Sequence, residues 1–231
     1  IDFALTSTQS NLSASVSGHQ LSNGCVQINL GSNSLEVQLN TLGAHNVRNA
    51  LAASAVALAA GISPEKIKQG LEAFAPVNGR MQVKFSDSKY TLIDDSYNAN
   101  PDSVRAAIDA LKQSVGSSWL VLGDMGEVGN QGPEFHREVG AYAAEQGIAK
   151  LFSLGEQSVF AMNGFESAKT SAASSASHFT SVENLISKLN EELRSYLDNG
   201  NKHLNILVKG SRFMRMERVV QALLEEAKTC S

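Results

Sequence analysis

The chain has 231 residues, of which 42% are hydrophobic, and a formal net charge of −4 from 19 basic and 23 acidic side chains. That is enough for a buried core in one large domain or two modest ones. Because the charge is small and Lys and Arg form no run, the sequence argues against an extended nucleic-acid interface.

The longest apolar run, residues 51–60, is about half the ~20 residues that a membrane span requires, and no signal peptide is evident. Cys25 and Cys230 lie far apart and lack metal-ligand spacing, so neither a zinc site nor a disulfide framework is predicted. These features fit a cytoplasmic protein without a membrane partner.

The N-terminal part predicts a small antiparallel sheet followed by two helices. β-like segments separated by Gly and Asn-Gly turns are expected at residues 1–5, 12–16, 25–30 and 35–39. An Ala- and Leu-rich pattern predicts a helix over 45–60 that is closed by Gly61. Pro64 is expected to start a second helix, which extends to about residue 74.

The stretch 75–79 contains Pro, Asn and Gly, so we expect a domain boundary there, between residues 1–76 and 77–231. Beyond it, strands and helices alternate, which predicts an α/β fold with a Rossmann-like, mostly parallel sheet and helices on both faces. The expected strands are 81–85, 90–94, 119–122, 150–154, 177–179 and 204–208. The expected helices are 101–113, 133–146, a short one from 156, 182–196 and 214–227. The Ser- and Ala-rich segment 167–177 is predicted to be a loop.

Polar side chains open the first long helix. His45, Asn46 and Asn49 precede an otherwise apolar segment, and His45 and Asn49 are four residues apart, on one face of the first turn. Two interpretations are open: the three groups contact one ligand, or Asn46 caps the helix and His45 is solvated.

Arg80 follows Asn78-Gly79 at the expected boundary. An arginine in a tight turn at a hinge can bind a phosphate across a cleft as a two-pronged donor. The alternative is a surface arginine paired with a carboxylate. The position at the hinge favours the phosphate.

Residues 91–104 read as a buried strand, a polar turn and a capped helix. Asn100 is predicted as the helix cap, with Pro101 at the first helical position. The carboxyl end of a parallel strand is the usual place for a ligand, so Asp95 is a candidate to accept from a ribose hydroxyl. Asn98 or Asn100 is a candidate to hold a second group. The alternative is an Asn-rich turn with a cap.

A second strand ends in a Gly-rich turn that contains Asp124 and Glu127. Its spacing matches neither a phosphate loop nor a dinucleotide-binding loop. The two acids either help to hold a metal or an amine, or belong to a tight turn. His136, His178 and His203 have no matching partners in the sequence and are expected at the surface.

The last strand is followed by a Gly turn flanked by three cations, Lys209, Arg212 and Arg215, which are candidates to receive a carboxylate or phosphate at a helix N-terminus. Alternatively, Arg212 and Arg215 pair with acidic neighbours.

Together these motifs resemble the Mur ligases of peptidoglycan synthesis. The resemblance covers most of the chain, from about Leu39 to the end, and is weakest in the first 38 residues and the Ser-rich loop. The motifs that carry it are Gly-x-His-Asn-x-x-Asn-x-x-Ala-Ala at 43–53, Gly-Arg-Met at 79–81, Asp-Asp-Ser-Tyr-Asn-Ala-Asn-Pro at 94–101, Leu-Gly-Asp-Met-Gly-Glu at 122–127 and Lys-Gly-Ser-Arg at 209–212.

The resemblance implies a ligase that uses ATP to phosphorylate the carboxylate of UDP-MurNAc-tripeptide, after which the amine of D-Ala-D-Ala attacks the acyl phosphate. Residues 1–76 would be the C-terminal part of the central ATPase domain, and 77–231 the C-terminal domain. The phosphate loop and the metal-binding Glu of the family are not in this sequence. We therefore expect a monomeric fragment that is inactive alone, with ATP and Mg²⁺ as cofactors and the Mg²⁺ ligands mostly outside it.

The resemblance also assigns roles to the candidate residues. Arg80 and His45 are expected to be catalytic, with Arg80 at the γ-phosphate and Asp95 at the ribose. The expected ATP contacts are Asn46, Asn49, Arg80 and Asp95, and the expected substrate contacts are Asn98, Asn100, Lys209, Ser211 and Arg212. Two alternatives are a ligase like the folylpolyglutamate synthases and a non-catalytic amino-acid-binding domain.

Overall fold

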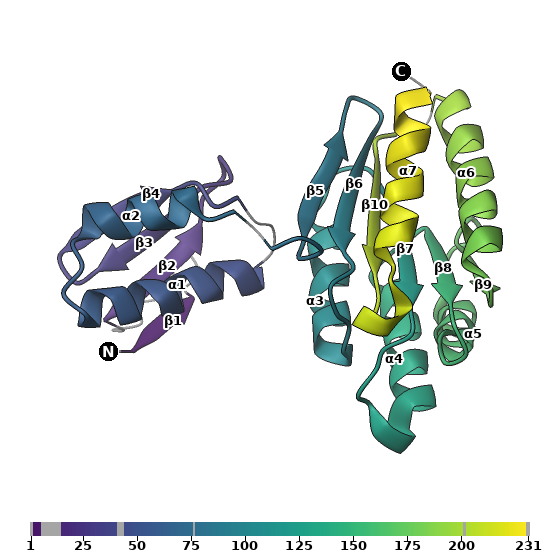
Figure 1. Cartoon of the computed structure of the whole chain (residues 1–231), viewed down its shortest axis with the longest axis horizontal. Helices are drawn as coiled ribbons and strands as arrows, with labels where there is room; N and C mark the ends of the chain where they lie inside the picture. Colours follow the sequence, from purple (N-terminus) through teal and green to yellow (C-terminus); the bar gives the residue numbers. More distant parts are fainter. Residues whose placement is uncertain (1, 6–14, 41–43, 76, 201, 230–231) are drawn as a thin grey trace. The chain divides into compact units, whose positions relative to one another are not determined.

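The computed structural model describes residues 2–5, 15–40, 44–75, 77–200 and 202–229 (Figure 1). The chain divides into two compact units, Ile1–Pro76 and Val77–Ser231, which we describe separately. The division falls where the Pro-, Asn- and Gly-containing stretch predicts a domain boundary. Within the described ranges, no helix has the length and apolar character needed to cross a membrane.

The first unit consists of a four-stranded sheet and two helices. Its strands, in spatial order, are β1 (Phe3–Leu5), β2 (Val16–Gln20), β3 (Val26–Leu30) and β4 (Asn33–Val37). The predicted meander is confirmed for β2, β3 and β4, which pair antiparallel. It is wrong for β1, which pairs parallel with β2, because a strand pattern does not fix the direction of pairing. The position predicted for β2 is also wrong: the strand covers 16–20 where 12–16 was expected, and Gly18, expected in a turn, lies inside it. Residues 12–14 lie outside the described part.

The helices of the first unit are α1 (Ala44–Ala59) and α2 (Pro64–Ala73). Gly61 closes α1 as predicted: it has a φ of +77°, and its N–H donates to the Leu58 carbonyl at 3.0 Å. The next N–H, of Ile62, donates to Ala57 at 3.0 Å, which completes a Schellman motif. The core between the sheet and the helices contains Val16, Val26, Ile28, Leu30, Val37, Val47, Leu51, Ala55 and Ile67.

The second unit is a six-stranded sheet with the order β5-β6-β10-β7-β8-β9. The strands are β5 (Gln82–Ser86), β6 (Tyr90–Asp95), β7 (Ser117–Gly123), β8 (Lys150–Leu154), β9 (Ser175–Phe179) and β10 (Leu204–Lys209). The helices are α3 (Pro101–Lys112), α4 (Gly132–Glu145), α5 (Ser158–Ala168), α6 (Val182–Asp198) and α7 (Glu217–Thr229). Only the edge strand β5 is antiparallel to its neighbour among these described strands.

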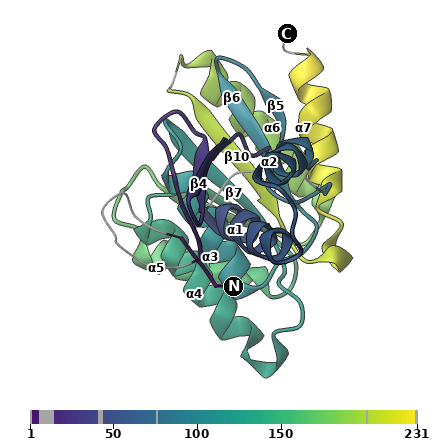
Figure 2. The same cartoon turned by 90° about the vertical axis from the view of Figure 1, so that its left-hand side faces the viewer.

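Helices cover both faces of this sheet, α3, α4 and α5 on one side and α6 and α7 on the other (Figures 1 and 2). Successive side chains of a strand point to opposite faces, so the inner strands supply two cores. Leu120 and Leu122 pack with the first helix layer, whereas Trp119 and Val121 pack with the second. The predicted α/β class with a mostly parallel, doubly covered sheet is therefore confirmed.

Several element boundaries of the second unit differ from the sequence prediction, and two of these differences change the type of element that was expected. The Ser- and Ala-rich segment expected as a loop over 167–177 contains the start of β9, because pairing with β8 supplies the order that the composition does not. The last helix starts at Glu217, after a separate 3₁₀ turn over Arg212–Met214.

The last strand of the chain, β10, lies between β6 and β7 and is parallel to both. Its position brings three strand ends to one edge of the sheet. We call this the carboxyl edge and define it by residues 95–100, 123–129 and 209–213, which follow β6, β7 and β10. The motifs predicted to bind ligands in the second unit are in these segments or, in the case of Arg80, beside them.

Candidate functional site

Arg80 is exposed and lies in a turn with unusual backbone geometry. Gly79 has a φ of +75° and Met81 a φ of +46°, so left-handed residues flank it on both sides. The Gly79 carbonyl accepts a hydrogen bond of 2.9 Å from Tyr97 N–H, which joins this turn to the carboxyl edge. A Cβ atom on Gly79 would lie 2.8 Å from Tyr97 N, so the close approach requires glycine.

The guanidinium of Arg80 lies over the ring of Tyr97, 4.4 Å from its centroid. A cation–π contact of this kind restricts a long side chain that would otherwise be mobile. The Tyr97 side chain is 41% exposed, so the stacked pair faces solvent. Among the described residues, no carboxylate forms an ion pair with Arg80, so the stacking on Tyr97 is the contact that the structure gives its guanidinium.

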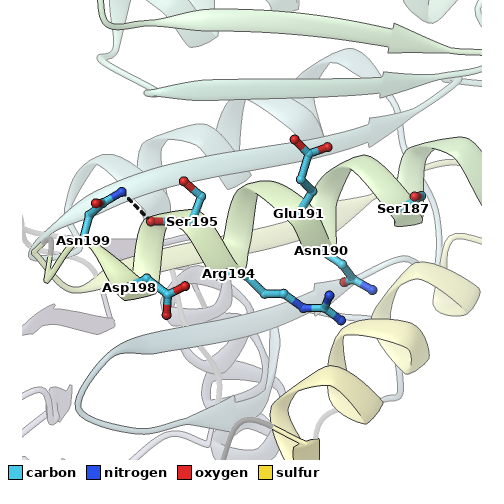
Figure 3. Close-up of a pocket in the computed structure, with 7 residues that line it drawn as sticks. All are labelled: Ser187, Asn190, Glu191, Arg194, Ser195, Asp198 and Asn199. Atoms are coloured by element: carbon cyan, nitrogen blue, oxygen red, sulfur yellow. Dashed lines mark hydrogen bonds between the residues drawn. The ribbon is translucent and has the colours of Figure 1, made fainter.

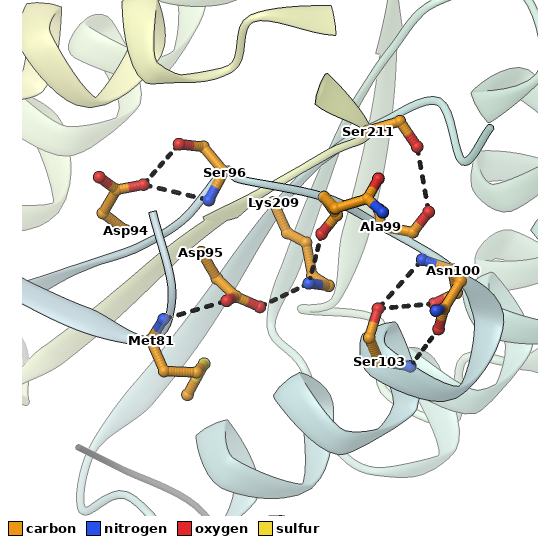
Figure 4. A network of polar contacts seen from close by, with 10 residues as sticks. Met81, Asp94, Asp95, Ser96, Ala99, Asn100, Ser103, Lys209 and Ser211 are labelled. Atoms are coloured by element: carbon orange, nitrogen blue, oxygen red, sulfur yellow. Dashed lines mark hydrogen bonds and ion pairs between the residues drawn. The ribbon is translucent and has the colours of Figure 1, made fainter. Parts of the chain in front are cut away.

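Asp95 is the last residue of β6, and each of its carboxylate oxygens has a partner (Figure 4). Oδ1 accepts from Met81 N–H at 3.0 Å, and Oδ2 accepts from the Lys209 ammonium at 2.6 Å. Asp95 and Lys209 are register partners on neighbouring parallel strands. The Asp95 side chain is 12% exposed, so a small part of its surface stays accessible to a ligand.

Asp94 does not share this environment, because adjacent residues of a strand point to opposite faces. Its Oδ1 accepts from the backbone N–H and the hydroxyl of Ser96, at 3.1 and 2.6 Å. Its Oδ2 lies 3.8 Å from the Lys84 ammonium. The two consecutive acids therefore form no carboxylate pair, and Asp94 stabilises the turn after β6.

Lys209 and Ser211 are both buried and connect the segments of the carboxyl edge. Besides Asp95, the Lys209 ammonium donates to the Asn98 carbonyl at 2.8 Å. The Ser211 hydroxyl donates to the Ala99 carbonyl at 3.0 Å and accepts from Gly126 N–H at 2.6 Å. Both side chains, which were candidates for substrate contacts, thus hold the ends of β6, β7 and β10 together.

Asn98 and Asn100 are exposed in the loop after β6. The predicted cap is confirmed: Asn100 Oδ1 accepts from Ser103 N–H at 2.8 Å, and the Ser103 hydroxyl accepts from Asn100 N–H at 3.0 Å. Pro101 occupies the first helical position, as expected. The cap uses the Asn100 oxygen, so its amide nitrogen is the group left to face a ligand.

Arg212 is exposed at the start of the 3₁₀ turn that follows β10. Its guanidinium lies 3.3 Å from Glu217, an ion pair between solvent-accessible groups. Such pairs contribute little stability and exchange partners easily. Beside it, the ring of Phe213 is 64% exposed. Of Lys209, Ser211 and Arg212, the three predicted substrate contacts in this segment, Arg212 is the one with an accessible cation.

Asp124 is buried at the end of β7 and is used by the fold. Its carboxylate accepts from the N–H groups of Glu156, Gln157 and Ser158 at 2.7 to 3.2 Å. Ser158 is the first residue of α5 and the other two directly precede it, so the carboxylate lies at the N-terminus of this helix, where negative charge is favoured. No group of three or more His, Cys, Asp or Glu side chains suited to a metal occurs among the described residues. The tight-turn interpretation is therefore the better one for Asp124.

His136 is fully buried, so its prediction as a surface residue is wrong. Its Nδ1 lies 2.6 Å from the Gly132 carbonyl, and its Nε2 lies 2.9 Å from Met125 N–H. A donor at Nδ1 and an acceptor at Nε2 define a neutral imidazole. Burial lowers the pKa of His136 and keeps it uncharged. His178 and His203 are half-buried and bond to Ser153 and Thr91.

The candidates of the first unit are on α1. Asn46 is partly buried and Asn49 is exposed, and both lie in the first turns of the helix. Because α1 begins at Ala44, Asn46 is inside the helix and is not its N-cap residue. The His45 side chain lies outside the described part. The grouping of these residues with Arg80 and Asp95, which are in the other unit, stays a prediction.

The second unit also has a surface pocket that contains none of the predicted site residues (Figure 3). It lies along the C-terminal half of α6, which leads to the amino end of β10, away from the carboxyl edge. Its lining residues are Ser187, Asn190, Glu191, Arg194, Ser195, Asp198 and Asn199. These side chains come from α6 and its C-cap residue, Asn199, and Arg194 is paired with Glu226.

Tyr97 is the residue of this site that the sequence analysis overlooked. Its position inside the polar motif at 94–101, followed by an asparagine, was the available signal. That its ring would carry Arg80, 17 positions earlier, depends on the hydrogen bond between Gly79 and Tyr97 and was not predictable from spacing.

Comparisons with known proteins identify the family of this chain. Residues 79–212 match the family model described as Mur ligase, glutamate ligase domain. The UDP-N-acetylmuramoyl-tripeptide--D-alanyl-D-alanine ligase of Haemophilus influenzae is 39% identical over 84% of this chain and 40% of its own length. The chain thus spans less than half of this curated relative.

Solved structures give the same result. A crystal structure of MurF from Acinetobacter baumannii superposes with a TM-score of 0.80 and 31% identity, over 92% of this chain and 46% of that one. MurF from Thermotoga maritima, solved in complex with ADP, shares the fold with a TM-score of 0.75 and 20% identity, over 94% of this chain and 48% of that one. With the match to the family model and the 39% identity, these findings confirm the resemblance seen in the motifs: the chain belongs to the Mur ligase family.

Proposed function

We propose that this chain is the C-terminal part of a cytoplasmic ligase that uses ATP to join D-alanyl-D-alanine to UDP-MurNAc-tripeptide in peptidoglycan synthesis. The observation that carries the proposal is the exposed Arg80 guanidinium, which stacks on the Tyr97 ring in a turn whose next residue, Met81, is hydrogen-bonded to the buried Asp95 carboxylate. The names of the curated relative and of the solved structures support the same reaction.

In this proposal Arg80 contacts the γ-phosphate of ATP, and the accessible edge of Asp95 accepts from the ribose. An arginine fits the phosphate because its planar fork donates two parallel hydrogen bonds to neighbouring oxygens. Asn46 and Asn49 contact the nucleotide from the first unit, and His45 acts near the reacting groups. The Mg²⁺ that accompanies ATP is assigned, on the resemblance to the family, mainly to residues outside this chain.

The dipeptide is assigned to the loops after β6 and β10. Arg212 has an accessible cation for the carboxylate of D-Ala-D-Ala, and Asn98 and the Asn100 amide nitrogen are polar groups for the peptide. Lys209 and Ser211 support this region by fixing the loops. An acyl phosphate must be protected from water, so we expect two domains to close over it. The complete enzyme is expected to act as a monomer, and this chain alone to be inactive.

The test uses a chimera in which this chain replaces the matching C-terminal part of the Haemophilus influenzae relative. Phosphate release is measured with UDP-MurNAc-tripeptide, ATP and D-Ala-D-Ala. We expect Arg80→Met to lower kcat/KM for ATP about tenfold to a hundredfold, because a hydrogen bond to a charged group contributes roughly 1.5–3 kcal/mol. Arg105→Met is the control, since Arg105 pairs with Glu138 on the helix surface. Equal kcat/KM in the parent chimera and Arg80→Met would reject the assignment.

The alternatives give different results in the same assay. Amide formation with glutamate but not with D-Ala-D-Ala would indicate a folylpolyglutamate synthase-like activity. Tight binding of D-Ala-D-Ala to the isolated 231-residue chain, measured by calorimetry together with an inactive chimera, would indicate a binding module.

A further inference from the structure

Lys209 occupies a position that a substrate contact does not explain. The residue is 2% exposed, and its ammonium already donates to Asp95 Oδ2 and to the Asn98 carbonyl. Removing an ammonium from water is unfavourable unless it is paired and hydrogen-bonded. A substrate carboxylate would have to displace these partners to reach it.

The partner of Lys209, in turn, contacts the turn that carries Arg80. Asp95 uses one oxygen for the lysine and the other for Met81 N–H, at 3.0 Å (Figure 4). The lysine therefore fixes the orientation of the carboxylate, and the carboxylate fixes the backbone of the residue that follows Arg80.

The turn needs such an anchor. Met81 is a non-glycine residue with a φ of +46°, which is unfavourable for a side chain with a Cβ. It is also buried, so its N–H has to be satisfied within the protein. On the other side of Arg80, Gly79 is held by the hydrogen bond from Tyr97 N–H. The Arg80 backbone is thus held from both sides, and its guanidinium reaches the Tyr97 ring.

We propose that Lys209 is a positioning residue: through Asp95 and Met81 it fixes the turn that places the Arg80 guanidinium over Tyr97. The positioning follows from the contacts of this chain. Only the purpose of the placed guanidinium, binding a phosphate, rests on the proposed function.

The experiment exploits the fact that a carboxylate has two accepting oxygens and an amide has one. In Asp95→Asn, Lys209 and Met81 N–H compete for a single oxygen, and one of them faces the NH₂ group. In the double variant Asp95→Asn with Lys209→Met, the competing ammonium is gone and the amide oxygen is free to return to Met81 N–H. A positioning role therefore predicts that the second substitution repairs the first.

The readouts are taken by NMR on the 231-residue chain without any ligand. Exchange of the Met81 amide is compared with that of Phe152, a buried residue of β8 that reports on the unit as a whole. The ring-current shift of the Arg80 side chain reports its stacking on Tyr97. We expect Met81 exchange in Asp95→Asn and in Lys209→Met to rise at least about tenfold relative to Phe152, with loss of the Arg80 shift. In the double variant, we expect both to return toward the parent values.

Lys112→Met is the matched control, because the Lys112 ammonium donates to the Gln146 side chain at 2.6 Å and has no contact with the Arg80 turn. It should change neither readout. The proposal is overturned if Met81 and Phe152 accelerate equally in the single variants, if the Arg80 shift persists in them, or if the double variant shows no recovery. If Lys209→Met alone does not fold, the comparison of Asp95→Asn with the double variant decides. These readouts do not depend on ATP or catalysis, so they can fail while the chimera assay succeeds, or the reverse.

Discussion

His136 illustrates how one buried side chain determines the shape of a loop. Its two ring nitrogens contact Gly132 and Met125, which are at opposite ends of the segment that joins β7 to α4. The sequence contained a signal for its burial. His136, Val139, Gly140 and Ala143 have the spacing of one helix face, and all four are buried. The polar type of the residue concealed a position that the helical period places in the core.

This geometry predicts a dependence of stability on pH. Because burial holds the pKa of His136 below its ordinary value of 6.5, the unfolded chain binds a proton at pH values where the folded chain does not. The free energy of unfolding should be highest above about pH 6.5 and fall as the pH decreases below it. Urea denaturation at pH 7.5 and at lower pH measures the change.

His136→Gln identifies the source of the effect. At pH 7.5 this variant should be about 1–3 kcal/mol less stable, because Met125 N–H or the Gly132 carbonyl loses its partner. The difference in the free energy of unfolding between this variant and the parent should become smaller as the pH falls. His178, whose pKa is also lowered by burial, remains in both proteins. Parallel stability curves for the two proteins would show that His136 is not the titrating group.

Among the elements, α4 and α5 make an unusually close crossing. A Cβ atom on Gly140 would lie 1.9 Å from the Ala161 carbonyl oxygen, and one on Gly164 would lie 2.1 Å from the Arg137 carbonyl oxygen. Backbone atoms cannot move aside as a flexible side chain does, so only glycine fits at these two positions. Glycine lowers the intrinsic stability of each helix, and the close packing of the two helices offsets this loss.

We expect Gly140→Ala to lower the free energy of unfolding by about 1–3 kcal/mol or more, since the new methyl group forces the two helices apart. Gly70→Ala is the opposite case, because Gly70 is exposed in α2 and a Cβ there meets nothing within 4 Å. It should stabilise its unit by about 0.5–1 kcal/mol. Thermal unfolding, followed by circular dichroism, measures the stability of both variants. A Gly140→Ala variant as stable as the parent would mean that α4 and α5 can move apart without loss of stability.

The elements themselves were more predictable than their partners. β8 has the predicted bounds, and the cap at Asn100 was evident, because both depend on residues that are close in sequence. The direction of β1 relative to its neighbour was not predictable, since it depends on which strand β1 pairs with. The pair formed by Asp95 and Lys209 could not be predicted either, because 114 positions separate the residues and only the sheet order makes them neighbours.

At the scale of the whole molecule, each unit has its own apolar core. The core clusters of Val77–Ser231 contain no residue of the first unit, and the cluster of the first unit contains none of the second. The single tryptophan of the sequence, Trp119, is fully buried in the second unit. Its fluorescence therefore reports on the unfolding of that unit.

We expect residues 77–231, expressed alone, to show the same urea midpoint by tryptophan fluorescence as the 231-residue chain. In the 231-residue chain, urea unfolding followed by circular dichroism should show a second transition, with a different midpoint, that comes from the first unit. A midpoint for the shorter protein that is clearly lower would show that the first unit stabilises the second.

The position of β10 has a consequence for synthesis on the ribosome. A nascent chain that has emerged only to residue 203 carries β6 and β7 without the strand that lies between them, so their inner backbone groups have no partner. The sheet of the second unit is complete only when β10 has inserted between β6 and β7. Folding of this unit should thus wait until β10 has left the ribosome, and the gap between β6 and β7 should be where a product that stalls before β10 aggregates.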